Sequence, residues 1–503
     1  MQKQKKIGLF LSIAMIVGSV VGIGIFFKNQ SVSKAVNGDG ISWLLAWIIG
    51  GIISIAAAIS FIEIGSFKNT KLIGLSNWVY KISKNKHLAY HCSVAYTLFY
   101  WGLLNAVIGI FASESLFFFF VLIKAVDAQS IKIWMHVIVG LLLSTVFIAL
   151  NVFSLKASAN FQIVITVVKF LPLLFALIIG IALPNIHNNE GKNAFFQHAF
   201  SLKGLIVALP AVLFSYDAFL VSSSISQKTK NPQKTLPKAI LVGMILVVIL
   251  YSLIALSSIL HSKGVISDLI NDVLPKKYSS SVSATIIFFV FASSLGVING
   301  LSSAFISELK ANVENNLLFG SKKLKEKIGL QGTFIMYLIF IEIFYFLIII
   351  VPSIVFNTDI FVDGLSNFPT VFFFAIYGIT ILMYLIKRNK IEDSKKINSV
   401  LFYTSAIIAV VGITLLELSY LYFQFENLII NRTNNPSGWG VFWDNNQGAL
   451  IKFYVPFVLY MVLFAYFMSI PWINYAFEKA IFKRDMIKDL DLNEANSHHN
   501  TVL

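Results

Sequence analysis

The stretch GSVVGIGIF, from Gly18 to Phe26, places three glycines in the middle of the first long apolar segment. Each glycine weakens a helix by roughly 1 kcal/mol relative to alanine. In a lipid bilayer, a loosened helix also leaves backbone amides without hydrogen-bond partners. The pattern therefore predicts either a small-residue packing face between helices or a helix that is broken halfway through the membrane.

The composition indicates an all-α integral membrane protein. Of the 503 residues, 57% are hydrophobic and 13% are charged, whereas a soluble domain carries about 25% charged residues. The single cysteine, Cys92, excludes an internal disulfide framework and any multi-cysteine metal site. A span needs roughly 20 apolar residues. Twelve spans are expected, at residues 7–27, 41–66, 90–122, 131–153, 159–183, 203–226, 237–261, 281–308, 332–355, 366–386, 398–424 and 450–474.

The distribution of basic residues predicts the orientation. With the N-terminus inside, 27 of the 39 Lys and Arg residues fall in cytoplasmic segments, and 11, including Lys28 and Lys34, fall in outer segments. By the positive-inside rule, both termini are cytoplasmic. The first span has a basic leader without a small-residue cleavage site and is expected to remain uncleaved. The net charge of +15 then reflects topology and anionic lipid rather than nucleic-acid binding.

The remaining basic residue, Lys169, lies in the middle of the fifth apolar segment. An ionisable group at this depth requires a partner or a water-filled cavity, so its default interpretation is functional. The alternative is that its side chain reaches an interface. The long apolar runs on both sides of Lys169 favour the functional interpretation.

Six carboxylates lie within or at the ends of spans: Glu63, Glu114, Asp217, Glu308, Glu342 and Glu417. Glu63 and Glu308, near cytoplasmic ends, are expected to be solvated or to cap helices. Glu114, Glu342 and Glu417 are expected to form hydrogen bonds between helices rather than to contact a substrate. The sequence contains no HExxH, GxSxG or phosphate-binding loop, and therefore offers no support for an enzyme.

Asp217 lies in a second irregular span, LPAVLFSYDAFLVSSS, which contains Pro210 and ends in three serines. Interrupted spans in corresponding positions of two repeats indicate a transporter binding site. Spans one and six correspond if spans 1–5 and 6–10 are inverted repeats. At such breaks, free N–H and C=O groups can hold a carboxylate and an ammonium, and an amino acid carries both.

Four segments together resemble one known family. GSVVGIGIF is similar to a first-helix signature of Gly-Ser-Gly, a hydrophobic residue and Phe, and FSYDAFLVSSSISQKTKNPQKTLPKAI is similar to a sixth helix with its loop. TVVKFLPLLFALIIG and GVINGLSSAFISELKANVENNLL are similar to the fifth and eighth helices. The family is the amino acid–polyamine–organocation permeases.

The resemblance implies a LeuT-like core of five plus five inverted-repeat helices, with helices 1 and 6 discontinuous, followed by two peripheral helices. The expected domains are a transport core at 1–390, with helices 1–5 at about 7–183 and helices 6–10 at about 203–386, then helices 11–12 at 391–484 and a polar cytoplasmic tail at 485–503.

The resemblance also implies site residues. Backbone N–H groups around Ile23 and Gly24 would hold a substrate carboxylate, and carbonyls near Val20, Phe214 and Asp217 would take the amino group. The implied substrate-binding set is Ser19, Val20, Gly22, Ile23, Gly24, Phe214, Tyr216, Asp217 and Ala218. The residues that would line or gate the cavity are Tyr100, Trp101, Asn105 and Asn299.

Lys169 is similar to a lysine of several family members, which occupies the place that a sodium ion takes in sodium-coupled relatives. Its ammonium would tie helix 5 to the unwound part of helix 1, so transport is expected not to depend on sodium. The chain departs from the family pattern at three positions: Ile23 replaces a serine, Leu220 replaces an acidic residue of many bacterial relatives, and Ser307 replaces an arginine. These departures leave coupling and selectivity open.

Asp217 supports three hypotheses: binding of a cationic side chain, proton carriage, or capping of the resumed helix. The expected function is a secondary amino acid transporter of the plasma membrane, working by alternating access as a proton symporter or an exchanger. It would need no cofactor or metal, and its expected substrates are cationic or broad-range amino acids. The alternatives are a polyamine or organic-amine transporter and a non-transporting amino acid sensor. The expected partners are the substrate, lipid and, in a symporter, protons; a partner subunit is not determined by the sequence.

Overall fold

The computed structural model describes residues 8–22, 24–68, 70–183, 195, 198–217, 220, 232–356, 360–432, 434, 452–490 and 492. Within these ranges, all regular secondary structure is helical. The all-α fold class predicted from the apolar segments is therefore confirmed for the described part of the chain.

The helices of the first half follow the apolar segments. Side-chain caps fix some of their starts: Asp39 accepts a hydrogen bond from the Ser42 N–H, and Asn85 accepts from the N–H groups of His87 and Leu88. In chain order, the elements are α1 (Leu9–Val20), α2 (Gly24–Ala35), α3 (Gly40–Ile64), α4 (Gly74–Ser83), α5 (Lys86–Ala95), the π-helix η1 (Tyr96–Trp101), α6 (Gly102–Leu122), the short η2 (Ala128–Ser130), α7 (Ile133–Phe153), α8 (Leu155–Val168) and α9 (Phe170–Ala182).

The second half contains longer helices, of which α16 is kinked at Gly329, where φ is +73°. Its elements are α11 (Leu202–Tyr216), α13 (Pro232–Leu260), α14 (Ile266–Val273), α15 (Lys276–Glu314), α16 (Ser321–Phe356), α17 (Ile360–Lys387), η5 (Arg388–Lys390), α18 (Ser399–Glu426), η6 (Asn427–Asn431) and α19 (Val455–Phe482).

Ten helical stretches of the described chain are long and apolar enough to cross a membrane, and each coincides with an expected span. The other two expected spans differ. The segment expected as the first span is split into α1 and α2, and the sixth is described only as the shorter α11 and the residues Asp217 and Leu220. The chain is therefore a multi-pass membrane protein.

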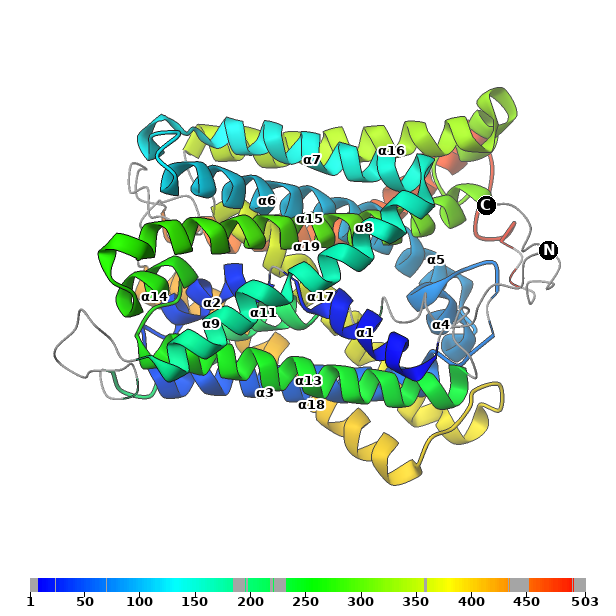
Figure 1. The fold of residues 1–503 in the computed structure, drawn as a ribbon. Coiled ribbons are helices and arrows are strands. Elements are labelled where there is room, and N and C mark those ends of the chain that lie inside the picture. Colours follow the sequence, from blue (N-terminus) through cyan, green and yellow to red (C-terminus); the bar gives the residue numbers. More distant parts are fainter. Residues whose placement is uncertain are drawn as a thin grey trace.

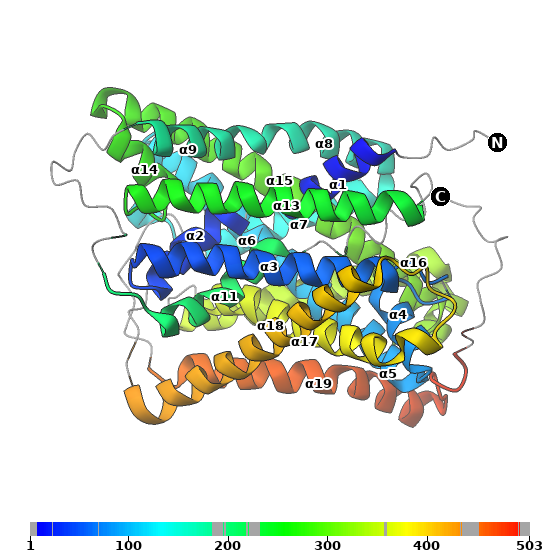
Figure 2. The same ribbon diagram turned by 90° about the horizontal axis from the view of Figure 1, so that it is seen from below.

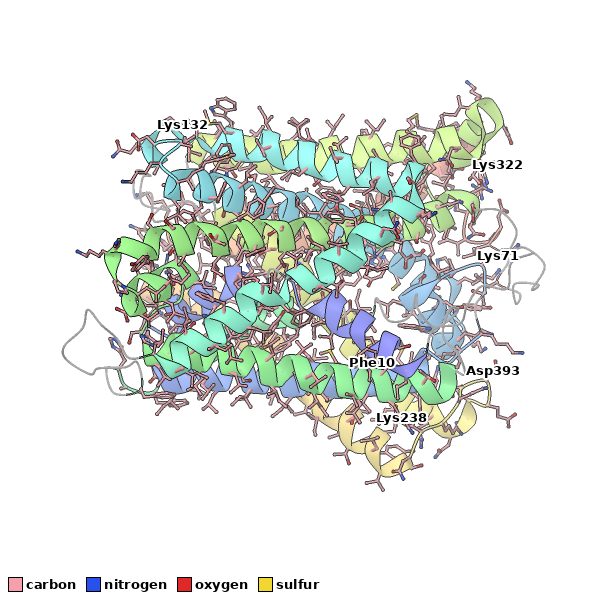
Figure 3. All side chains as sticks on the ribbon, in the orientation of Figure 1. Phe10, Lys71, Lys132, Lys238, Lys322 and Asp393 are labelled. Atoms are coloured by element: carbon pink, nitrogen blue, oxygen red, sulfur yellow. The ribbon has the colours of Figure 1, made fainter. Side chains whose placement is uncertain are left out.

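The long helices run along one common axis (Figures 1 and 2). α1 begins and α19 ends at the end of the bundle that holds α4, here called the α4 end. α2 continues beyond the break toward the opposite end, which holds α14 and is called the α14 end. Figure 3 shows Lys71, Lys322 and Asp393 at the α4 end and Lys132 at the α14 end.

The interior of the bundle is filled by large aromatic side chains. α3 packs along α13, α11 and α18, and α15 packs along α6. Trp47 of α3 is fully buried and packs edge-to-face against Tyr216 of α11 and Tyr251 of α13. This packing holds α11 and α13 beside the break between α1 and α2.

Candidate functional site

The first span is broken at the predicted glycines. α1 ends at Val20, Val21 has φ −68° and ψ 105°, and α2 begins at Gly24. Extended backbone at this point leaves the last carbonyls of α1 and the first N–H groups of α2 without partners within a helix. The break predicted from the stretch GSVVGIGIF is therefore confirmed.

The hydroxyl of Tyr251 joins the two sides of this break. It donates to the Val20 carbonyl at 3.2 Å and accepts from the Gly22 N–H at 3.3 Å. Tyr251 is fully buried in α13. One side chain thus occupies two of the backbone groups that the break exposes.

The end of α11 lies against the start of α2. α11 ends at Tyr216, and Asp217 is extended, with φ −63° and ψ −179°. A Cβ atom on Gly24 would come within 2.6 Å of the Ser215 Cα atom, which is closer than real Cβ contacts allow. Gly24 is therefore needed for the close approach of the two backbones. The interruption of the first span and the end of α11 face one another.

A small cavity of about 60 Å³ lies between these two ends. Seven residues of its lining are expected site residues and five are not. The expected ones are Val20, Gly22, Gly24, Tyr100, Trp101, Phe214 and Asp217; the others are Leu104, Ile108, Ser215, Val297 and Leu301. The lining is mostly apolar with few polar groups, as in small-molecule sites.

Asp217 is the carboxylate of this cavity, and Tyr100 donates a hydrogen bond to its Oδ2 atom. Tyr100 comes from η1, a π-helical turn between α5 and α6. Such turns often occur at functional sites because they redirect side chains. Tyr100 also packs against Tyr96 and Phe373, with ring centroids 5.0 and 4.6 Å apart. The contact places a hydroxyl and a carboxylate together at the cavity wall.

Lys169 lies where α8 gives way to α9 and is 2% exposed. Its ammonium donates a hydrogen bond to the carbonyl of Gly18 near the end of α1. The fifth expected span is therefore tied to the first one close to its break. The close packing continues at Thr166, whose Cγ2 atom lies 3.1 Å from the place of a Cβ on Gly18.

Other expected site residues lie elsewhere. The Tyr216 hydroxyl donates to the Trp47 carbonyl at 3.1 Å, away from the cavity lining. Asn105 donates to Glu342 at 2.8 Å and Asn299 donates to Gln162 at 2.8 Å, and neither lines the cavity. Ile23, Ala218 and the side chain of Ser19 lie outside the described residues.

The buried carboxylates show one agreement and two corrections. The Asn105–Glu342 bond joins α6 to α16, as expected of an interhelical group. Glu63, however, is fully buried and forms an ion pair of 2.7 Å with Arg388, so the expectation of a solvated or capping Glu63 is wrong. Glu308 is also buried, at 8% exposure, and is not solvated.

Lys28 gives another correction. Its place after the first apolar segment assigns it to an outer loop, but it lies in α2 and is fully buried. Neither Lys28 nor Tyr251 carries a sequence signal of its role, because lysine at a span end and tyrosine within a span are common. Within the described residues, no group of three or more His, Cys, Asp or Glu side chains could hold a metal ion.

Comparisons with known proteins identify relatives across much of the chain. It is 22% identical to the serine/threonine exchanger SteT of Bacillus subtilis over 81% of this chain and 89% of that protein. It is 25% identical to the b(0,+)-type amino acid transporter 1 of Rattus norvegicus over 82% of both chains. It is 26% identical to the Homo sapiens cystine/glutamate transporter over 59% of both chains, so that match spans less than two thirds of the human protein.

The family model described as "Amino acid permease" matches residues 7–443. This range contains the broken first span, Lys169, α11 and Asp217. The family and these named relatives are transporters rather than enzymes. The chain therefore belongs to the amino acid permease family, within the amino acid–polyamine–organocation superfamily.

Proposed function

We propose that this protein carries amino acids across the plasma membrane by alternating access. The observation that carries the proposal is the cavity between the break of the first span and the end of α11, with Asp217 in its wall. Interrupted helices that face each other expose the backbone groups that bind a zwitterion. The names of the relatives, an exchanger and two transporters, agree with this function.

The proposed topology has twelve spans. α1 and α2 together form the first, and the segment that begins with α11 forms the sixth. Spans 1–5 and 6–10 form inverted repeats within residues 1–390, and helices 11 and 12 occupy 391–484. The α4 end, which holds Lys71 and Lys322, is the cytoplasmic end, and it is where α1 begins and α19 ends.

Backbone groups bind the part common to all amino acids. N–H groups at the start of α2, near Gly24, hold the carboxylate, and carbonyls near Val20 and Phe214 take the amino group. The hydrogen bond from Tyr251 uses one lone pair of the Val20 carbonyl and leaves the other for a substrate. Asp217 then selects the side chain and favours cationic or broad-range amino acids.

Lys169 replaces a coupling cation. A fixed ammonium beside the end of α1 supplies the charge that a sodium ion would supply between the first and fifth spans. The transporter therefore runs without sodium, as an exchanger or as a proton symporter. It needs no cofactor.

The test is counterflow in proteoliposomes that are loaded with an amino acid mixture and offered each labelled amino acid in turn. Wild-type protein should take up at least one amino acid. Uptake restricted to arginine, lysine or ornithine that is lost in Asp217→Asn assigns Asp217 to the side chain. Uptake of neutral amino acids that survives Asp217→Asn assigns it to capping.

Leu220→Asn serves as a control for changes beside the cavity, since Leu220 is buried and does not line it. No flux of any amino acid through folded protein would overturn the proposal. Labelled polyamines are then offered, because Asp217 in the cavity wall also suits an organic cation.

A further inference from the structure

A buried lysine lies between the cavity and the α14 end. Lys28, one turn into α2, has no exposed surface. Burying an ammonium is costly unless its donors are used and its charge is balanced. A buried lysine at this depth therefore indicates a functional role that depends on the groups it contacts.

The contacts of Lys28 join helices that border the cavity. Its ammonium donates to the Ser366 hydroxyl of α17 at 2.6 Å. It also lies 4.9 Å from the ring centroid of Phe214 in α11 and 5.5 Å from that of Phe111 in α6. Phe27, the preceding residue, stacks on Phe111 at 4.7 Å. One side chain thus links α2 to three other helices.

Phe214 connects this cluster to the substrate. It lines the cavity, whereas Lys28 and Ser366 do not. Because α2 runs from the cavity at Gly24 toward the α14 end, Lys28 lies on that side of the cavity, where it contacts the Phe214 ring and α17. A cation over an aromatic face holds the ring in place, most strongly where water is excluded.

We infer that Lys28 is a positioning residue that closes the cavity on its α14 side, by fixing the Phe214 ring and by fastening α2 to α17. The inference rests on the proposed function, in which the α14 end faces outward and the cavity must open to that side during transport. To open, α2 has to separate from α17 or Phe214 has to turn away, and both movements break contacts of Lys28.

The experiment measures access to the cavity directly. Cys92, the only cysteine, is buried and is changed to serine, and the cavity residue Leu104 is changed to cysteine. A membrane-impermeant thiosulfonate is added to either face of oriented vesicles. Lys28→Met should raise the labelling rate from the outer face about tenfold and lower it from the inner face, because a charge-assisted hydrogen bond is lost from one of two states.

Three variants keep the outcome decisive. Lys28→Arg should restore the original rates, and Ser366→Ala should shift them in the same direction as Lys28→Met but by less. Lys34→Met removes an exposed lysine from the same helix and should change nothing. Unchanged outer labelling in both Lys28→Met and Ser366→Ala, or faster labelling from both faces, would overturn the inference.

The labelling needs no substrate and therefore separates the two proposals. A rate that depends on Lys28 in a protein without amino acid counterflow would leave the closure standing and remove the proposed transport function. If the protein shows amino acid counterflow but its labelling rate does not change in Lys28→Met, the transport function stands and the closure by Lys28 is removed.

Discussion

The ammonium of Lys169 donates a hydrogen bond to the backbone carbonyl of Gly18. Both ends of this contact lie at irregular places, since Lys169 separates α8 from α9 and Gly18 lies two residues before the end of α1. A charged donor therefore meets a carbonyl at the point where the helix begins to lose its own hydrogen bonds. The contact ties the position of the break to the fifth span.

Removal of this ammonium is predicted to slow transport strongly. Hydrogen bonds that involve a charged group contribute about 1.5–3 kcal/mol, which corresponds to roughly a 10- to 100-fold change in an equilibrium. Lys169→Met should reduce counterflow by at least about tenfold, whereas Lys156→Met, at an exposed site of α8, should not. Replacing sodium by choline should leave wild-type counterflow unchanged. Full activity of Lys169→Met in sodium-free buffer would contradict this role.

Tyr251→Phe is predicted to weaken substrate binding. The variant keeps the ring but removes the hydroxyl that joins the Val20 carbonyl to the Gly22 N–H. Each lost hydrogen bond is worth about 0.5–1.5 kcal/mol, so the KM for counterflow should rise severalfold.

Tyr216→Phe is the matched control, because it removes a hydroxyl from the same aromatic cluster that bonds to Trp47 and not to the break. It should leave KM near the wild-type value. Equal KM changes in the two variants would mean that the bridge across the break has no special part in binding.

Gly24→Ala is predicted to abolish transport while the protein still inserts and folds. The new methyl group would lie 2.6 Å from the Ser215 Cα atom and must push α2 away from α11. Overpacking of this kind costs about 1–3 kcal/mol, and the displacement falls on two residues that line the cavity. Size-exclusion profiles report on folding, and counterflow reports on activity.

Gly300→Ala controls for the loss of a glycine in a membrane helix, since nothing lies within 4 Å of the place of its Cβ. Its counterflow should equal that of wild type. Normal counterflow in Gly24→Ala would show that the two backbones do not need to approach so closely.

The sequence predicts those features that depend on local backbone chemistry. Glycines at 18, 22 and 24 weaken the first span whatever surrounds it, so its break is predictable. Lys169 stands out because an apolar run offers it no solvent, and the structure gives it the Gly18 carbonyl as a partner. Asp217 stands out for the same reason.

Features that depend on distant partners are not predictable in this way. The burial of Glu63 depends on Arg388, which lies 325 residues further along the chain. Tyr251 reaches the break only because α13 packs along α1, and nothing in its own segment indicates that contact. Lys28 follows an apolar run, which is typical of a residue at the end of a span. Because the span is broken, however, a second helix, α2, begins after the break, and Lys28 is buried within it. A rule that places charges at span ends fails where the span is interrupted.

Removing one partner of the Glu63–Arg388 ion pair is predicted to destabilise the fold more than removing both. Arg388 donates to both carboxylate oxygens of Glu63, at 2.9 and 2.7 Å, and both side chains are buried. Removing one partner of a buried pair costs about 3–5 kcal/mol, because the other charge is left unpaired. Arg388→Met should therefore lower the thermal unfolding temperature in detergent strongly, and the double variant Glu63→Gln/Arg388→Met should lower it less. A double variant that is less stable than Arg388→Met would contradict this account.

The described residues that follow α19, at 483–490, are predicted to be part of the fold and not a free tail. Met486, Ile487 and Leu490 are 0%, 2% and 3% exposed, and the Lys86 ammonium donates to the Leu490 carbonyl at 2.6 Å. Lys86 begins α5, the helix that leads into η1 and Tyr100, so this segment packs against the start of a span that lines the cavity.

Two neighbouring residues test this packing. Leu490→Ala should cost about 2–4 kcal/mol, because it opens a gap in buried apolar surface. Asp489 is 54% exposed and forms a surface ion pair with Arg484, and such pairs are worth about 0–1 kcal/mol, so Asp489→Ala should change thermal stability little. Equal stability of the two variants in detergent would mean that the segment is held by its charges at the surface. A large loss in Leu490→Ala alone would show that its apolar side chains anchor it to α5.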